Sequence, residues 1–312
     1  HFAAISSREP TWMNERPGKR REGPRVSQQS GEGEQKKPER RRGRSAIATM
    51  VSAAAAPPRT VMITGVSRGL GRALALELAR RDHTIIGCAR SQENLSSLQA
   101  EVAAASPPGT TPPKHFFTAV DVRSDSSVRE LAKVLAEAKQ VPDIIGSGVL
   151  GVVCFSYSAE KEKLFSPVNN AGTINKNNKI WEVPPEEFDT VIDTNVKGTT
   201  NVLRHFLPLM IEKKQGIVVN VSSSWGRSAA AEVAPYCASK WAVEGLTRSV
   251  AKELPPGIAA VALSPGVVNT DMLASCFGSS ASLYQTPEAW APKAANMILN
   301  LTTLDNGASL TV

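Results

Sequence analysis

From Arg59 onward, short apolar runs alternate with longer segments in which apolar residues recur every three or four positions. The short runs are typical of buried strands, and the longer segments are typical of amphipathic helices. Strands are predicted at 60–65, 83–89, 116–121, 141–145, 216–222, 258–263 and 308–312, and helices at 69–81, 94–104, 124–139, 186–213, 234–254 and 287–301. This alternation indicates an α/β fold with one doubly wound parallel sheet, which binds ligands at the carboxyl ends of its strands.

A glycine-rich turn, TGVSRGLG at Thr64–Gly71, follows the apolar run Val61–Ile63 and leads into the predicted helix 69–81. Glycine permits a positive φ and lets backbone N–H groups approach a pyrophosphate. The positive end of the helix dipole also attracts that group. The sequence therefore predicts a dinucleotide site at this turn.

A second signature lies in the predicted helix 234–254, where Tyr236 and Lys240 are four residues apart and Ser223 precedes Tyr236 by thirteen residues. Side chains at i and i+4 share one face of a helix. A phenol has an ordinary pKa of about 10, and a nearby ammonium favours the phenolate, so such a tyrosine can act as a general acid or base. Taken alone, the pair could equally be a solvated helix face.

Together the two signatures resemble the short-chain dehydrogenase/reductase family, in its form with a TGxxxGxG turn and a YxxxK site. Further matching motifs follow in order, at Asp121-Val122, Asn169–Gly172, Asn195, Ser222-Ser223 and Pro265–Thr270. The resemblance covers nearly all of residues 59–312. It implies a single Rossmann-like domain and an oxidoreductase.

The resemblance also implies the roles of the site residues. Tyr236 would give its proton to a carbonyl oxygen, and Lys240 would stabilise the phenolate and bind the nicotinamide ribose. Ser223 would orient the carbonyl, and Asn195 would hold a water that links Lys240 to solvent.

The cofactor implied is NADPH. The second strand ends in Cys88-Ala89-Arg90, without the carboxylate that would bind the ribose of NAD. Arg68 and Arg90 could instead pair with a 2′-phosphate. The cofactor-binding residues expected are Thr64, Gly65, Ser67, Arg68, Gly69, Leu70, Gly71, Arg90, Asp121, Val122, Asn170, Ala171, Gly172, Tyr236, Lys240, Pro265, Gly266, Val268 and Thr270.

The substrate is inferred from fewer residues. Trp225 and Phe277 would join Ser223 and Tyr236 at the substrate, because aromatic faces suit a flat heteroaromatic ligand, although core packing would explain them equally well. Four segments, 173–177, 179–183, 224–228 and 275–278, are similar to family members that reduce 6-formylpterin-type aldehydes to alcohols in folate salvage. The alternatives are a carbonyl reductase of broader specificity and a catalytically impaired NADPH-binding scaffold.

The family pattern is interrupted once. The strand 141–145 should lead directly into Val168 and the turn Asn169–Gly172, but residues 146–167 intervene. Either this insertion loops out and Val168 resumes the strand, or the apolar run Val149–Phe155 replaces it. We favour the first interpretation, because both flanks still match the family.

Residues 1–58 are expected to be a disordered, basic and Pro/Ala-rich extension. Residues 1–49 hold 12 of the 36 Lys and Arg and 6 of the 29 Asp and Glu, which leaves 24 basic and 23 acidic residues in the rest. The high pI therefore belongs to this extension, and nucleic-acid binding by the enzyme domain is not expected. The sequence begins with His, and we expect residues before Met50 to be an extended or artefactual reading frame.

The four cysteines, at 88, 154, 237 and 276, have no CxxC or His-adjacent spacing, so neither a disulfide framework nor a metal site is predicted. No apolar run is long enough for a membrane span or a signal peptide. We expect a cytosolic enzyme that acts on a small-molecule aldehyde. By resemblance it would form a dimer or tetramer through the helices 186–213 and 234–254.

Overall fold

The computed structural model describes residues 58–107, 115–137, 144–145, 168–169 and 172–312. In this part of the chain the strands form one parallel sheet in the order β3-β2-β1-β5-β6-β7-β8, and β4 also pairs with β6. The strands are β1 Thr60–Thr64, β2 Thr84–Ala89, β3 Phe116–Ala119, β4 Ile144–Ile145, β5 Val168–Asn169, β6 Gly216–Val221, β7 Ile258–Ser264 and β8 Ser309–Thr311. The predicted doubly wound parallel sheet is confirmed.

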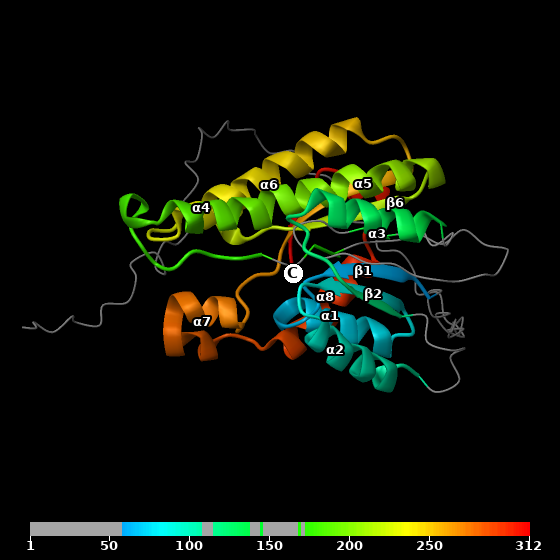
Figure 1. Cartoon of the computed structure of the whole chain (residues 1–312), viewed down its shortest axis with the longest axis horizontal. Coiled ribbons are helices and arrows are strands. Elements are labelled where there is room, and N and C mark those ends of the chain that lie inside the picture. The colour runs from blue at the N-terminus through cyan, green and yellow to red at the C-terminus, as the bar shows by residue number, and fades with distance from the viewer. Residues whose placement is uncertain (1–57, 108–114, 138–143, 146–167, 170–171) are drawn as a thin grey trace, which may run out of the picture. The chain divides into compact units, whose positions relative to one another are not determined.

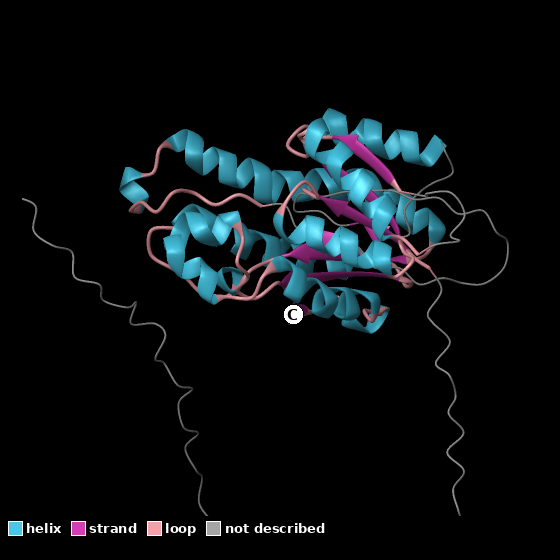
Figure 2. Ribbon diagram, turned by 90° about the horizontal axis from the view of Figure 1, so that it is seen from below, coloured by secondary structure: helices cyan, strands magenta, loops and turns pink. Residues whose placement is uncertain are grey.

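Helices cover both faces of the sheet (Figure 1). They are α1 Gly69–Arg80, α2 Gln92–Ala105, α3 Asp125–Glu137, α4 Pro185–Ile192, α5 Gly198–Lys213, α6 Ala234–Glu253, α7 Asp271–Phe277 and α8 Pro287–Leu299. Figure 2 shows helices (cyan) lying in front of the strands (magenta) when the molecule is seen from below.

The side chains of the strands pack into two apolar cores, one on each face of the sheet. Val61 and Ile63 of β1 pack with α1, α2 and α8, whereas Met62 between them packs with α3 and α5. Successive side chains of a strand point to opposite faces, so a central strand buried on both sides is apolar throughout. This accounts for the short continuous apolar runs in the sequence.

Two short strands, β4 and β5, both pair with β6 and together occupy the fourth strand position of the sheet. Ile145 pairs with Val218 of β6, and Asn169 pairs with Asn220. One residue, Val219, lies between the two partners on β6, and one residue, Val168, precedes Asn169. Ile145 and Val168 therefore take successive places in the ladder, although residues 146–167, which lie outside the described residues, separate them in sequence.

One predicted helix differs from the structure. The segment 186–213 is divided into α4 and α5 by a π-helical turn, Asp193–Lys197. Such turns insert an extra residue into a helix and often occur at functional sites. Asn195 lies in the middle of this turn and is fully buried.

Candidate active site

Helix α6 and the end of β6 bring Ser223, Tyr236 and Lys240 together. Tyr236 and Lys240 share one face of α6, and the Lys240 Nζ lies 5.6 Å from the centroid of the Tyr236 ring. The Lys240 ammonium donates a hydrogen bond of 2.9 Å to the carbonyl of Val221 in β6. Ser223 hydrogen-bonds with the phenol of Tyr236. The side chains of the predicted Ser, Tyr and Lys thus meet at one place.

Burial dominates the electrostatics of this pair. It raises the pKa of Tyr236 to about 12, and the hydrogen bond with Ser223 opposes this shift. Burial also lowers the pKa of Lys240 to about 8. The pKa of the phenol therefore lies above its ordinary value, because the loss of water around the ring outweighs the hydrogen bond with Ser223.

Asn195 ties the loop that follows β5 to helix α6. Its Oδ1 accepts from the Thr173 N–H at 2.9 Å, and its Nδ2 donates to the Thr173 carbonyl and to the Ser239 hydroxyl, each at 2.9 Å. Both N–H donors are therefore used within the protein. Only the second lone pair of Oδ1 remains for a water.

Gly172 lies between these groups. A β-carbon at this position would be 3.4 Å from the Asn195 Oδ1 and 3.5 Å from the Lys240 Nζ. Both polar atoms therefore face the backbone of Gly172, which follows β5 in the sequence. The predicted cofactor residues Asn170 and Ala171 lie outside the described residues.

The glycine turn has the conformation that its sequence predicts. Gly65 and Gly69 have φ values of 62° and 56°, which favour glycine, and α1 starts directly after Arg68. The first turn of α1 carries no acidic residue that would repel an anion. The Thr64 hydroxyl is buried and has no hydrogen-bond partner among the described residues. Ser67, Leu70 and Gly71 belong to the same turn and helix start.

A cavity opens beside this turn at the carboxyl ends of β1, β2 and β3. Its lining residues are Gly65, Cys88, Ala89, Arg90, Val120, Asp121, Val122, Arg123 and Thr194. Of the predicted cofactor residues, four thus lie around one cavity. A cavity that holds apolar walls, two guanidinium groups and a carboxylate fits the adenosine end of a phosphorylated dinucleotide.

The predictions missed Arg123. Its Nε donates to both carboxylate oxygens of Asp121, at 3.1 Å to Oδ1 and 3.0 Å to Oδ2, and its Nη2 donates to Oδ2 at 2.6 Å. These hydrogen bonds hold the pKa of Asp121 below its ordinary value, and the charge of Arg90 acts in the same direction. The signal available in the sequence was a basic residue two positions after Asp121.

The segment after β7 lies across from the glycine turn. Pro265 accepts a hydrogen bond from the Trp290 indole at 3.0 Å, Gly266 has a φ of 73°, and Val268 is buried. Thr270 caps α7, and a β-carbon at Gly69 would lie 3.8 Å from its methyl group. Arg68 reaches this side as well, with its Nη1 3.4 Å from the Asp271 Oδ2, in an exposed pair.

The Tyr236 ring is the first of three aromatic rings that contact one another in turn. The Trp225 ring meets the Tyr236 ring edge to face, with centroids 6.0 Å apart, and it stacks on Phe277 of α7 at 6.1 Å. The four predicted substrate residues are therefore brought together. Edge-to-face and offset-stacked arrangements are the geometries that aromatic pairs prefer.

Some features bear on other functions. Within the described residues, no group of His, Cys, Asp and Glu could hold a metal ion. No helix in the part of the chain that the structure describes is long and apolar enough to cross a membrane. Cys88, Cys237 and Cys276 are free thiols, and Cys154 lies outside the described residues.

Comparison with known proteins places the chain. Residues 59–279 match the family model described as short chain dehydrogenase. The chain is 62% identical over 254 residues to the NADPH-dependent pterin aldehyde reductase of Arabidopsis thaliana, which covers 81% of this chain and 93% of that protein. It is 32% identical over 217 residues to the 3-oxoacyl-[acyl-carrier-protein] reductase of Staphylococcus aureus, covering 69% of this chain and 76% of the relative.

The fold agrees with solved structures. A short chain dehydrogenase from Shigella flexneri, solved in complex with NADP, superposes with a TM-score of 0.69 and 23% identity and covers 82% of this chain and 98% of its own. At this identity the likeness establishes the fold alone. The motifs, their order and these matches together show that the chain belongs to the short chain dehydrogenase family.

Proposed function

We propose that this protein catalyses the NADPH-dependent reduction of a pterin aldehyde to the corresponding alcohol, a step of folate salvage. The observation that carries the proposal is the meeting of Ser223, Tyr236 and Lys240 beside the stacked rings of Trp225 and Phe277. The 62% identity to the pterin aldehyde reductase of Arabidopsis thaliana supports the choice of substrate.

The proton chemistry follows from the geometry and the burial of these groups. A phenol with a pKa of about 12 is protonated at neutral pH and can give its proton to the carbonyl oxygen as negative charge develops there. The Ser223 hydroxyl polarises the same oxygen. Lys240 then stabilises the phenolate, and Asn195 keeps the loop at Thr173 against α6. NADPH, when bound, supplies the hydride to the carbonyl carbon.

The cavity and the N-terminus of α1 beside it support the following cofactor contacts. The glycine turn would hold the pyrophosphate at the N-terminus of α1, and Asp121 and Val122 would border the adenine. Arg68 and Arg90 would pair with the 2′-phosphate. Gly172 and the segment Pro265–Thr270 would border the nicotinamide end.

The substrate proposal is tested by kcat/KM for 6-formylpterin, for non-pterin aromatic aldehydes and for 3-oxoacyl thioesters. We expect pterin to be preferred by at least tenfold, and Tyr236→Phe to lower kcat about 100-fold or more while NADPH affinity is kept. Equal turnover of unrelated aldehydes would favour a broader carbonyl reductase. NADPH binding without oxidation of NADPH by any aldehyde would favour an inactive scaffold.

The cofactor proposal is tested with Arg68→Ala and Arg90→Ala, alone and combined. We expect each change to raise the KM for NADPH about tenfold or more and to leave the KM for NADH nearly unchanged, because only NADPH carries the 2′-phosphate. Arg80→Ala, on the exposed side of α1, is the matched control. Equal losses for both cofactors would contradict this assignment.

We also propose that the enzyme acts in the cytosol as a homodimer or tetramer. Helices α5 and α6 are the surfaces expected to associate. Ile211 on α5 and Trp241 on α6 each leave a large apolar side chain exposed, by 41% and 54%, which supports this interface. Size-exclusion chromatography with light scattering, compared between the protein and its Trp241→Glu variant, tests this assembly.

A further inference from the structure

Helix α6 carries a third buried polar residue on the face of Tyr236 and Lys240. Glu244 follows Lys240 by four residues, and its side chain is only 3% exposed. Its Oε2 accepts from the Ser309 hydroxyl at 2.8 Å and contacts the Arg248 Nη2 at 3.3 Å. Its Oε1 is buried and accepts no hydrogen bond among the described residues.

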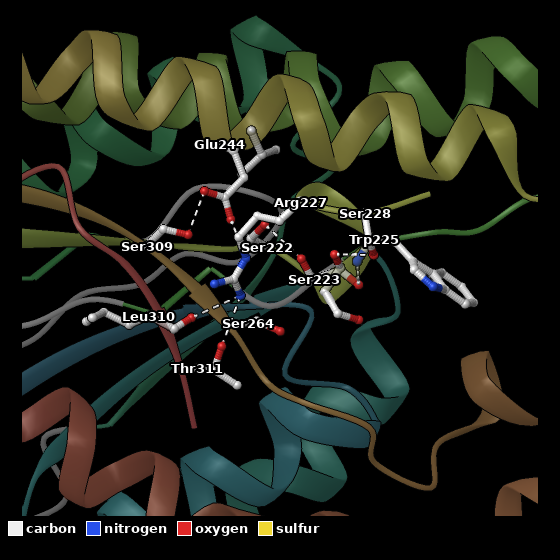
Figure 3. A network of polar contacts seen from close by, with 12 residues as sticks. Ser222, Ser223, Trp225, Arg227, Ser228, Glu244, Ser264, Ser309, Leu310 and Thr311 are labelled. Carbon is white, nitrogen blue, oxygen red and sulfur yellow. Dashed lines mark hydrogen bonds and ion pairs between the residues drawn. The ribbon is translucent and has the colours of Figure 1, made fainter. Parts of the chain in front are cut away.

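Arg227 is the cation that faces this second oxygen. Its Nε lies 3.6 Å from the Glu244 Oε1, and its Nη2 donates to the Thr311 hydroxyl at 3.0 Å. Figure 3 shows Arg227 between Glu244 on α6 and Leu310 and Thr311 on β8. One guanidinium thus joins the active-site helix to the strand β8.

Arg227 also ends the short turn that carries Ser223 and Trp225. The Arg227 N–H donates to the Ser224 carbonyl, and the Ser223 hydroxyl accepts from the Trp225 N–H at 3.2 Å. Within this turn, a β-carbon at Gly226 would lie 2.9 Å from the Lys240 carbonyl oxygen. The turn therefore rests against the backbone of α6, and a small displacement of it would move Ser223 relative to Tyr236.

The Glu244 carboxylate is buried but the Arg227 side chain is 33% exposed, so this ion pair is weak evidence for stability. What the guanidinium supplies is a rigid fork of donors placed between α6 and β8. We propose that Arg227, held by Glu244 and Thr311, is a positioning residue that sets Ser223 and Trp225 against Tyr236 for the reaction. This inference rests on the proposed function.

The test compares kcat, KM and thermal stability in Arg227→Met with those in Arg248→Met. Both changes remove a cation from Glu244, but within the residues that the structure describes no hydrogen bond or ion pair joins Arg248 to the turn or to β8. We expect Arg227→Met to lower kcat roughly tenfold to a hundredfold with an unchanged KM for NADPH, and Arg248→Met to change neither. Arg227→Lys, which keeps the charge without the fork, should recover only part of kcat.

A double-mutant cycle separates positioning from general destabilisation. In a Ser223→Ala background, Arg227→Met should cause little further loss of kcat, because its effect acts through Ser223. If Arg227→Met does not fold, Thr311→Val and Arg227→Lys take its place, and both should lower kcat. Unchanged kcat in the folded variants, or full additivity with Ser223→Ala, would overturn the proposal.

A readout without substrate keeps this inference apart from the proposed function. With 5-fluorotryptophan in place of tryptophan, the ¹⁹F resonance of Trp225, assigned with Trp225→Phe, reports the turn directly. We expect it to shift or broaden in Arg227→Met and not in Arg248→Met. An unchanged resonance in Arg227→Met would contradict the positioning role. Failure of the unaltered protein to reduce 6-formylpterin would contradict only the proposed function.

Discussion

At the scale of single residues, the site combines a phenol and an amine that burial shifts in opposite directions. Burial raises the pKa of Tyr236 to about 12 and lowers the pKa of Lys240 to about 8. Both shifts favour the neutral form, as expected when water is removed from either group. The pKa values of the two side chains thus differ from those of free tyrosine and lysine, and the Lys240 amine titrates close to physiological pH.

The activity should therefore depend on pH through Lys240. Its lowered pKa means that the ammonium is present below pH 8 and is lost as the pH rises through about 8. Because the charge stabilises the phenolate that forms during reduction, kcat/KM should fall tenfold per pH unit above that point. A pH profile of the steady-state rate, with NADPH saturating, checks this.

The control for this profile is Lys240→Arg, which stays charged at alkaline pH. Whatever activity the variant retains should lack the decline near pH 8. A decline at the same pH in both proteins would assign the titration to another group.

At the scale of elements, local signals predicted most of the fold. The glycine turn and the Tyr236–Lys240 helix have sequence patterns set by neighbours in the chain, and both formed as predicted. The π turn at Asp193–Lys197 could not be predicted, because the hydrogen bonds of Asn195 within it reach Thr173 and Ser239, which are distant in sequence. Helix α7 was missed because it is short and buries none of its residues.

The site likewise has features that the sequence predicts and features that it does not. Its residues could be found from motifs, because spacing along a strand or helix decides which side chains share an edge. The pKa of Tyr236 could not be foreseen, since it depends on how closely Trp225 and its other neighbours exclude water. The contacts of Arg227 with Glu244 and Thr311 join three elements and have no local pattern either.

The interrupted strand gives a prediction at this scale. Since Ile145 and Val168 take successive places opposite β6, a chain that lacks residues 146–167 should form the same sheet. Removing a 22-residue connection saves a loop-closure cost on the order of 3 kcal/mol. We expect the deletion variant to have a higher Tm, measured by differential scanning calorimetry, and to keep NADPH binding.

A variant in which residues 146–167 are replaced by an equal length of Gly and Ser separates length from sequence. It should match the unaltered protein in Tm. A deletion variant that unfolds more easily would support the other interpretation, in which the run Val149–Phe155 belongs to the strand.

At the scale of the whole molecule, acid should destabilise the fold through a buried histidine. His83 accepts a hydrogen bond from the Arg59 N–H at 2.9 Å, and burial, aided by the charges of Arg59 and Arg81, lowers its pKa from 6.5 to about 4. The unfolded chain therefore binds a proton between pH 6.5 and 4 that the folded chain does not. The contribution of His83 to the free energy of unfolding is therefore fully present above pH 6.5, and up to about 3 kcal/mol of it is lost as the pH falls towards 4.

Chemical denaturation at pH 7.5, 5.5 and 4.5 measures this loss. His83→Asn keeps an acceptor for the Arg59 N–H without a titrating ring, so its free energy of unfolding should vary less between pH 6.5 and 4. Parallel pH curves for the two proteins would show that other groups cause the acid sensitivity.

The dry surroundings of the Tyr236 ring decide which protonation state of the phenol predominates. A phenol with a pKa of about 12 is protonated at neutral pH, which is the state that gives a proton when an alcohol is made. Oxidation of the alcohol begins from the deprotonated oxygen, which becomes more abundant as the pH rises. Since making the alcohol consumes a proton overall, alkaline solution should also move the equilibrium back towards the aldehyde.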